Sequence, residues 1–210
     1  MTKAFDKAAQ IARRMSDASG AYNGAGTGAN TGLMEGTKVM TAMGYQMIED
    51  LEPGARMITA DNGIQFVRSV RREPLWFSTA ECPKSRQPLF IPAEAIGNAQ
   101  DITLLPHQAV MVESDMAEKV LGDRNVLMLA QDLEGVCGIH RVAPEGPATV
   151  VTLEFDNDEV IFAGSGAMCI CEARESADGK EYRTLETFRD AALVAAIRGE
   201  LNGGRATVAA

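Results

Sequence analysis

The stretch GLMEGTKVMTAMGYQMIEDLEPGARMITADNG, residues 32–63, decides the fold of this 210-residue chain. From Leu33 onward apolar and polar residues alternate, as they do in β-strands that bury one face. Residues 51–54 contain a Pro-Gly pair and residues 61–63 an Asn-Gly pair, which is the strongest short signal for a β-hairpin. The stretch therefore predicts short antiparallel strands joined by tight turns.

The same pattern continues toward the C-terminus. It is clearest in residues 151–156, where three apolar residues alternate with three polar ones before a turn at Asn157-Asp158 and a return strand at 159–163. Further strands are predicted at residues 37–41, 57–60, 64–70, 89–92, 102–105, 109–112, 126–129 and 138–142. Many short strands separated by turn signals predict a mainly β domain, which we place at residues 33–175.

Helical spacing flanks this β domain. Residues 1–18 repeat apolar side chains three and four positions apart, which predicts an amphipathic helix, and residues 19–32 form a linker rich in Gly, Ala and Asn. A C-terminal helix is predicted at 181–202, with Thr184 as its cap, Leu185 and Phe188 on its apolar stripe, and Gly203 as its end. We expect this helix to pack on the β domain or to pair with another helix.

Composition limits the classes of binding partner and the cellular compartments that fit this sequence. The chain has 20 Lys and Arg against 29 Asp and Glu, a net charge of −9, which argues against a nucleic-acid partner. No apolar run reaches the roughly 18 residues of a membrane span, and the charged N-terminal segment is unlike a secretory signal. Four unevenly spaced cysteines do not make a disulfide framework. These features predict a cytoplasmic protein, with export by another kind of signal left open.

Metal binding and catalysis have few candidates. Cys137, His140, Cys169 and Cys171 supply four possible zinc ligands, but their spacing is irregular, and core cysteines with a surface histidine explain them better. No metal or cofactor is therefore predicted. The three-residue spacing of Cys137 and His140 at a loop-to-strand junction does not align a nucleophile with a base.

An acidic group lies around one predicted hairpin. Its four members are Glu154, Asp156, Asp158 and Glu159. We interpret them as a solvated loop tip, and the alternative is a divalent-cation site, which would also need converging carbonyl oxygens.

Residues 32–63 resemble the opening block of Hint domains, the fold of hedgehog autoprocessing domains and inteins, and are closest to the bacterial Hint-like group. The matching positions are Gly36, Thr37, Val39, Thr41, Gly44, Ile48, Glu49, Asp50, Leu51, Gly54, Thr59, Asp61 and Gly63. Two later blocks, residues 102–112 and 156–163, resemble the family's histidine-bearing strands. The resemblance covers about residues 33–172 and implies a Hint-like all-β fold.

The family's activity is autoprocessing, in which a cysteine at the start of the domain attacks the preceding carbonyl and a histidine assists the acyl shift. The resemblance places Gly32 at the nucleophile position, Leu105 at the Ser/Thr position and Gln108 at the histidine position. It places Asp158 at the histidine of the later strand. His107 lies one residue out of register, which on a strand turns its side chain to the opposite face.

Two functions follow from this pattern. The first is a degenerate Hint domain that does not process itself and acts as a binding or scaffold module for a protein partner that the sequence does not identify. The alternative is a self-cleaving domain in which Thr31, Cys82 or Cys137 supplies a non-standard nucleophile. Cys82 lies in a polar, predicted loop and is more simply an exposed thiol.

Overall fold

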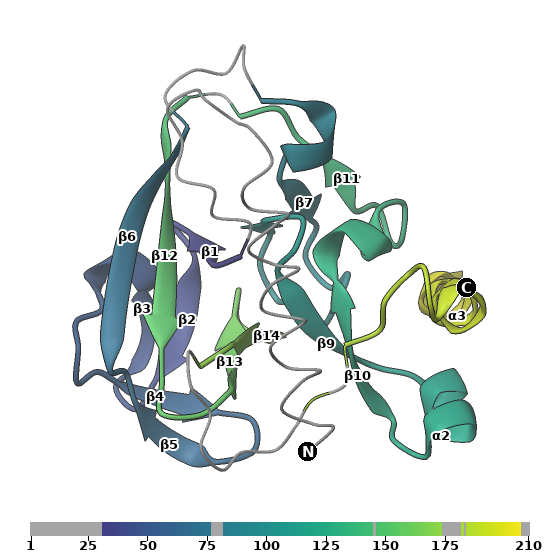
Figure 1. Cartoon of the computed structure of the whole chain (residues 1–210), viewed down its shortest axis with the longest axis horizontal. Coiled ribbons are helices and arrows are strands. Elements are labelled where there is room, and N and C mark those ends of the chain that lie inside the picture. The colour runs from purple at the N-terminus through teal and green to yellow at the C-terminus, as the bar shows by residue number, and fades with distance from the viewer. Residues whose placement is uncertain (1–30, 77–81, 145, 174–181, 183, 207–210) are drawn as a thin grey trace, which may run out of the picture.

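A computed structural model describes residues 31–76, 82–144, 146–173, 182 and 184–206 of the chain. The N-terminal helix predicted at 1–18 and the linker up to residue 30 lie outside the described residues. The described part is mainly β, as predicted, and its strands form two antiparallel sheets (Figure 1).

The six-stranded sheet carries the start of the domain near its centre. Its strands, in spatial order, are β11 (His140–Arg141), β7 (Leu89–Ile91), β8 (Ile102–Leu104), β1 (Leu33–Met34), β12 (Ala148–Glu154) and β6 (Ser69–Trp76). Strand β1 lies between β8 and β12, with Leu33 opposite both Leu104 and Val151. The first strand of the domain is therefore held from both sides.

The eight-stranded sheet contains the predicted hairpins. Its strands run in the order β10 (Asn125–Leu129), β9 (Ala109–Glu113), β14 (Ala167–Cys171), β13 (Glu159–Ala163), β2 (Lys38–Thr41), β4 (Arg56–Thr59) and β5 (Gly63–Phe66), and β3 (Gly44–Met47) pairs with β2. The Asn-Gly turn joins β4 to β5, with Ile58 opposite Ile64.

The return strand predicted at 64–70 is in fact two strands in different sheets. β5 ends at Phe66 and β6 begins at Ser69. Between them the Val67 N–H donates to the Ala55 carbonyl, while the Arg68 N–H donates to the Glu154 carbonyl. The chain changes its hydrogen-bond partner at this point, so a stretch that the sequence predicts as one strand crosses from one sheet to the other.

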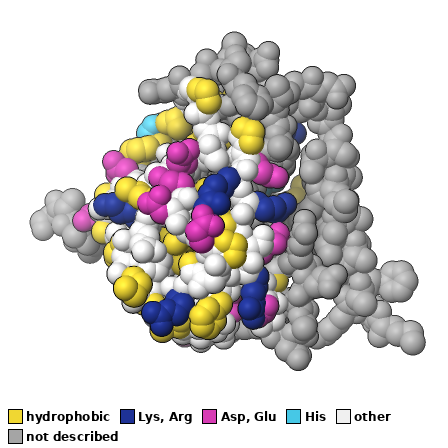
Figure 2. Space-filling model, turned by 90° about the vertical axis from the view of Figure 1, so that its left-hand side faces the viewer, with side chains coloured by type: hydrophobic (Ala, Val, Ile, Leu, Met, Phe, Trp, Pro, Cys, Tyr) yellow, Lys and Arg dark blue, Asp and Glu magenta, His cyan; other side chains and the backbone are white. Residues whose placement is uncertain are grey.

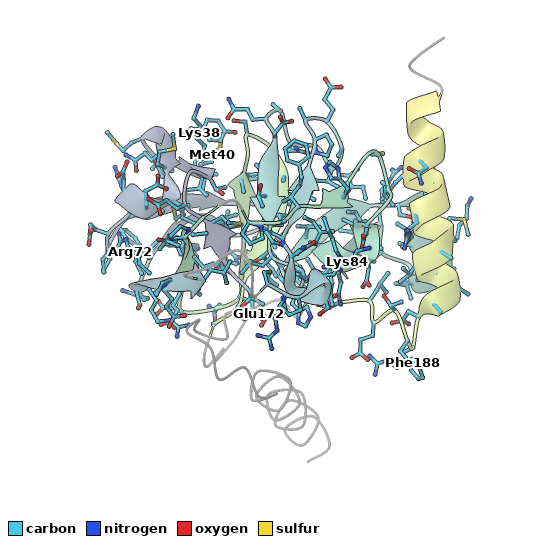
Figure 3. All side chains as sticks on the ribbon, turned by 90° about the horizontal axis from the view of Figure 1, so that it is seen from above. Lys38, Met40, Arg72, Lys84, Glu172 and Phe188 are labelled. Carbon is cyan, nitrogen blue, oxygen red and sulfur yellow. The ribbon has the colours of Figure 1, made fainter. Side chains whose placement is uncertain are left out.

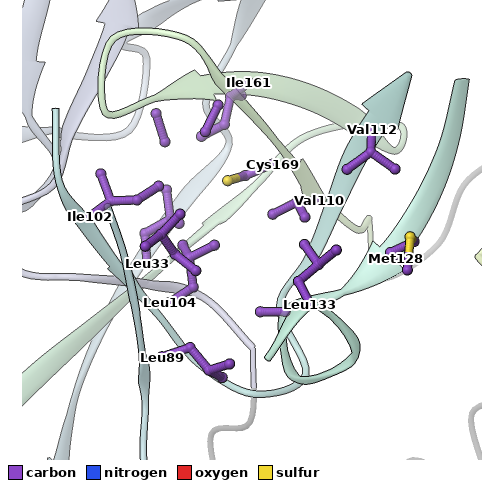
Figure 4. Packing of buried hydrophobic residues seen from close by; sticks show 14 of the residues in the cluster. Leu33, Leu89, Ile102, Leu104, Val110, Val112, Met128, Leu133, Ile161 and Cys169 are labelled. Atoms are coloured by element: carbon purple, nitrogen blue, oxygen red, sulfur yellow. The ribbon is translucent and has the colours of Figure 1, made fainter. Parts of the chain in front are cut away.

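The hydrophobic core lies where the two sheets face each other (Figure 4). Leu33 and Leu104 come from the six-stranded sheet, and Val110, Ile161 and Cys169 come from the eight-stranded sheet. Burial of apolar surface from both sheets stabilises their arrangement.

The C-terminal helix begins later than the sequence predicted. α3 spans Ala191–Ala206, so Gly203 lies inside it rather than ending it. Thr184 bridges to Leu127, and the Leu185 N–H donates to the Leu127 carbonyl. Phe188 is fully exposed and lies outside the helix (Figure 3). Residues 184–185 pair with β10 and therefore do not form the first turn of the predicted helix. This tertiary contact outweighs the helical spacing of the sequence.

α3 packs on the β domain through Val194 and Ile197, which are both buried in the main core. It also contacts α2 (Asp115–Leu121), a helix that the sequence analysis did not predict. The Ser114 hydroxyl oxygen accepts the N–H groups of Met116 and Ala117 and so caps α2. The Glu200 carboxylate of α3 accepts hydrogen bonds from the Ser114 hydroxyl and the Asp115 N–H, and these bonds lower the pKa of Glu200.

None of the helices in the described part of the chain combines the length and the apolar character that a membrane crossing requires.

Ser114→Ala is expected to lower the free energy of unfolding by about 1 kcal/mol, because the cap of α2 is lost. Ser85→Ala, at an exposed serine of the 3-10 helix η3 (Lys84–Arg86), is the matched control and should change the free energy of unfolding little.

Because the folded-state pKa of Glu200 is lowered, the contribution of Glu200 to stability is present above its ordinary pKa and is lost as pH falls through the folded pKa. Urea unfolding of Glu200→Gln should therefore show a weaker loss of stability in acid than the wild type.

Candidate functional site

The centre of the candidate site is a hydrogen bond between Gly32 and Gln108. The Gly32 N–H donates to Gln108 Oε1 over 2.9 Å. Gln108 Nε2 donates to the carbonyls of Ala109 and Ile170, each over 2.9 Å. Only the NH₂ end of the amide can face two carbonyl oxygens, so the orientation of the side chain is fixed. Gln108 is 3% exposed and thus holds three backbone groups in a buried position.

A tight turn between β8 and β9 presents Gln108 to this site. The Gln108 N–H donates to the Leu105 carbonyl, and the Gln108 carbonyl accepts the Ala130 N–H of η4 (Ala130–Leu133). Because residues 105–108 form this turn, the sequence argument that placed His107 on a strand was wrong in its premise. His107 is half-buried, and Gln108 is the residue that reaches Gly32.

Gly32 occupies a position that has no room for a side chain. Its φ of +118° lies in a region that L-residues rarely adopt. A Cβ there would lie 2.6 Å from Val150 Cγ1, 3.0 Å from Thr152 Oγ1 and 3.1 Å from the Val151 carbonyl oxygen. Leu105 belongs to the same small apolar cluster as Val150. Sequence reasoning missed Val150 and Thr152, since only the β1–β12 pairing brings them to Gly32.

Asp158, the fourth position that the family resemblance singled out, makes its contact elsewhere. It lies in the β12–β13 turn, and its Oδ1 accepts the Ala173 N–H over 2.8 Å. The structure therefore brings Gly32 to Gln108 by a hydrogen bond and places Gly32 and Leu105 beside Val150, while Asp158 holds the chain just after β14.

The alternative nucleophiles make other contacts. Thr31 is exposed. Cys82 Sγ lies 3.8 Å from the Pro83 carbonyl, and burial raises the pKa of the Cys82 thiol. The Cys137 N–H donates to Asn202 Oδ1 over 2.8 Å and its Sγ lies 3.4 Å from the Leu201 carbonyl, so Cys137 helps to hold α3.

The remaining cysteines are poor candidates for metal binding. Burial raises the pKa of Cys169 to about 12 and raises the pKa of Cys171 as well, which disfavours the thiolate form that binds metal. His140 Nδ1 lies 2.9 Å from the Gly138 carbonyl, and its ring packs against Phe90. Within the described residues, no three His, Cys, Asp or Glu side chains gather in a way that could hold a metal ion.

The acidic group of the β12–β13 hairpin is dispersed among separate partners. Asp156 accepts hydrogen bonds from Arg68, which lower the pKa of that carboxyl. Glu154 Oε1 lies 3.4 Å from Arg71 Nε, so these two side chains form an ion pair. Glu159 is buried, and its carboxylate accepts hydrogen bonds from Asn62 Nδ2. The interpretation of a solvated loop tip thus fits Asp156 and is wrong for Glu159, which the hairpin turns inward.

Three comparisons place the chain among known proteins. The profile of the Hint domain family matches residues 31–172. No curated protein is significantly similar to the chain. Among solved structures, a splice-inactive variant of the AceL NrdHF class 3 split intein is similar, with a TM-score of 0.43 and 13% identity over 69% of this chain and 99% of that one.

Two further solved structures are similar. The bacterial intein-like domain from Clostridium thermocellum has a TM-score of 0.43 and 12% identity over 67% of this chain and 99% of that one. The MchDnaB-1 intein has a TM-score of 0.41 and 15% identity over 65% of this chain and 98% of that one.

Gln108→Leu is expected to lower the free energy of unfolding by about 2 to 4 kcal/mol, because the Gly32 N–H and two carbonyls lose their buried partner. Chemical denaturation measures the difference, and Gln46→Leu at an exposed position of β3 is the matched control.

In Gln108→Glu one carboxylate oxygen would face two carbonyls, which raises the pKa of the introduced group. The stability of this variant should therefore be greatest in acid and fall as pH rises through that pKa.

Gly32→Ala should lower the free energy of unfolding by about 2 to 4 kcal/mol, through backbone strain and overlap with Val150. Gly36→Ala separates the two causes, since Gly36 has a φ of +87° but nothing within 4 Å of the added Cβ. Gly146→Ala has neither feature and serves as the neutral control. Equal losses for Gly32→Ala and Gly36→Ala in urea unfolding would contradict the overlap with Val150.

Proposed function

The chain belongs to the Hint domain family, and we propose that it is a member that does not process itself and acts as a binding or scaffold module. The observation that carries the proposal is the state of the Thr31–Gly32 peptide. Autoprocessing needs a side-chain nucleophile after the reacting carbonyl and a group that can protonate the departing nitrogen. Gly32 has no side chain, and its N–H already donates to a carbonyl-type oxygen.

Gln108 cannot take over the role of an acid. A carboxamide does not titrate in the range in which enzymes work, and both hydrogens of its Nε2 are engaged by Ala109 and Ile170. The side chain thus holds the peptide without supplying a proton to it. This supports a structural use of the position where the family resemblance expects a histidine.

The alternative, self-cleavage by a non-standard nucleophile, lacks a comparable observation. Cys82 and Cys137 contact Pro83 and α3 respectively, and neither makes a described contact with Gly32. Thr31 precedes the reacting carbonyl instead of following it. The alternative is therefore retained as an outcome of the test and is not a second proposal.

The compartment is part of the same proposal. None of the four cysteines, which all lie in the described part of the chain, forms a disulfide, and this fits the reducing cytoplasm that the sequence predicts. A net charge of −9 further supports a protein partner over a nucleic acid.

Purified wild-type protein is expected to keep its intact mass of 22.4 kDa during incubation with dithiothreitol. Mass spectrometry of the intact chain measures this, and the Gln108→His variant provides a comparison with an imidazole at the junction. A break between Thr31 and Gly32 in the wild-type chain would give fragments of 31 and 179 residues (210 − 31 = 179) and would put the self-cleaving alternative first.

Restoring the family residues should not restore the reaction. The triple variant Gly32→Cys, Leu105→Ser, Gln108→His places a Cβ against Val150 Cγ1, so we expect a less stable and uncleaved protein. Adding Val150→Ala should recover part of the stability. Thiol-dependent cleavage of the triple variant would show that the junction is free to adopt a reactive geometry.

A further inference from the structure

An apolar sheet surface lies outside the core, on strands β3, β2, β4 and β5. Opposite residues of paired strands share a face, so Met40 lies with Tyr45, Lys38 with Met47, Arg56 with Phe66 and Ile58 with Ile64. The inner face of β2 and β4 is buried and consists of Val39, Thr41, Met57 and Thr59. We call the other side the outer face and define it by Lys38, Met40, Tyr45, Met47, Arg56, Ile58, Ile64 and Phe66.

The outer face exposes large hydrophobic side chains. Tyr45 is 42% exposed, and Ile64 and Phe66 are each 51% exposed. Met43, in the β2–β3 turn, is more exposed still. Lys38 and Met40 project from the end of the body that lies away from α3 (Figure 3). Contiguous apolar exposure of this kind on a protein surface marks an interaction site.

The charge of the outer face is opposite to that of the whole chain. Lys38 and Arg56 are its only charged residues, since strands β2 to β5 contain no Asp or Glu, whereas the net charge of the protein is −9. Among the described residues neither Lys38 nor Arg56 forms an ion pair, and Arg56 Nη2 contacts only the Met43 sulfur, at 3.9 Å. Acidic residues lie in the connections, where Glu49 accepts the Gly36 N–H and Asp61 accepts the Tyr182 hydroxyl. Figure 2 shows the side of the molecule that lies at the left of Figure 1, where hydrophobic side chains are exposed among charges of both signs.

One edge of the same surface offers backbone groups. The Ile48 N–H donates to the Thr37 carbonyl, and hydrogen-bonded pairs alternate in an antiparallel ladder. Tyr45 and Met47 therefore direct their N–H and C=O groups away from β2, toward the open edge of β3, which pairs only with β2 in the described chain. These two residues also place their side chains on the outer face.

We infer that β3 accepts an extended segment of a partner protein as an additional strand, and that the residues this segment turns toward the outer face, which are every second residue, are in turn apolar and acidic. Its backbone bonds to Tyr45 and Met47, its apolar side chains cover the outer face, and its carboxylates meet Lys38 and Arg56. This inference rests on the proposed binding function and names the chemistry of its partner.

Charge and geometry favour this occupant over two others. A second copy placed face to face would bring Lys38 and Arg56 of one chain against a surface that has no carboxylate. An anionic membrane would attract two cations but repel the net charge of −9.

The test uses a capped peptide of eight residues in which every second residue is threonine and the residues between are in turn valine and glutamate, so that valine and glutamate share one face of the strand. The control peptide has lysine in place of glutamate. Calorimetric titration of the full chain is expected to show binding of the glutamate peptide at least about tenfold tighter than the lysine peptide. Lys38→Glu should weaken binding of the glutamate peptide about tenfold. Lys84→Glu, the same change at an exposed lysine of η3, should leave the affinity for this peptide unchanged.

A pair of variants at one residue tests strand addition. Met47 has a φ of −69°, which proline adopts without strain, and its N–H lies outside the β2–β3 ladder. Met47→Ala and Met47→Pro both remove the side chain, but only the second removes the edge N–H. Binding should be at least about tenfold weaker for Met47→Pro than for Met47→Ala, with equal thermal stability of the two variants.

Several results would overturn the inference. They are equal affinity for the two peptides, equal binding by the two Met47 variants, tighter binding to phosphatidylserine vesicles than to the glutamate peptide, or a concentration-dependent dimer that Lys38→Glu alters. Failure here is distinguishable from failure of the proposed lack of self-processing, because intact mass reports the junction and is independent of β3.

Discussion

The buried amide of Gln108 is the constraint that unites the domain. It joins three backbone positions that are far apart in sequence: Gly32 lies 76 residues before it and Ile170 lies 62 residues after it. Leaving any of these backbone groups buried without a partner costs about 1 to 3 kcal/mol. The folded chain must therefore bring all three positions to the Gln108 amide. The turn at 105–108, the pairing of β1 with β12 and the course of β14 all serve this requirement.

Local chemistry in the sequence was sufficient to predict the mainly β fold. The Asn-Gly turn gives the β4–β5 hairpin, and the alternation in 151–156 gives β12 and its turn into β13. Contacts between distant segments account for two of the differences. Val67 and Arg68 take partners in different sheets, and residues 184–185 pair with β10 despite their helical spacing. The short helix α2 has local signals, the Ser114 cap before its first residue and Gly122 after its last, and the sequence analysis overlooked them.

The site shows a similar division. Alignment in register with the Hint family pointed to Gly32 and Gln108, which the structure brings into hydrogen-bond contact. The sequence could not reveal why position 32 excludes a side chain, since Val150 and Thr152 reach it only across the β1–β12 ladder. It also could not place Asp158, whose partner Ala173 is set by where β14 ends. Residue identity thus located the junction, and long-range packing determined its chemistry.

The replacement of a titratable ring by an amide has a consequence for the whole fold. A histidine joined to the Gly32 N–H would change its hydrogen-bonding capacity near neutral pH, whereas a glutamine keeps one acceptor and two donors at every pH at which the protein is folded. While the amide joins Gly32 to β9 and β14, Val150 occupies the space that a side chain at position 32 would need. In the non-processing domain that we propose, loss of the reaction and gain of a permanent tie are then the same change, because the oxygen that accepts the Gly32 N–H stands where a proton donor would have to act.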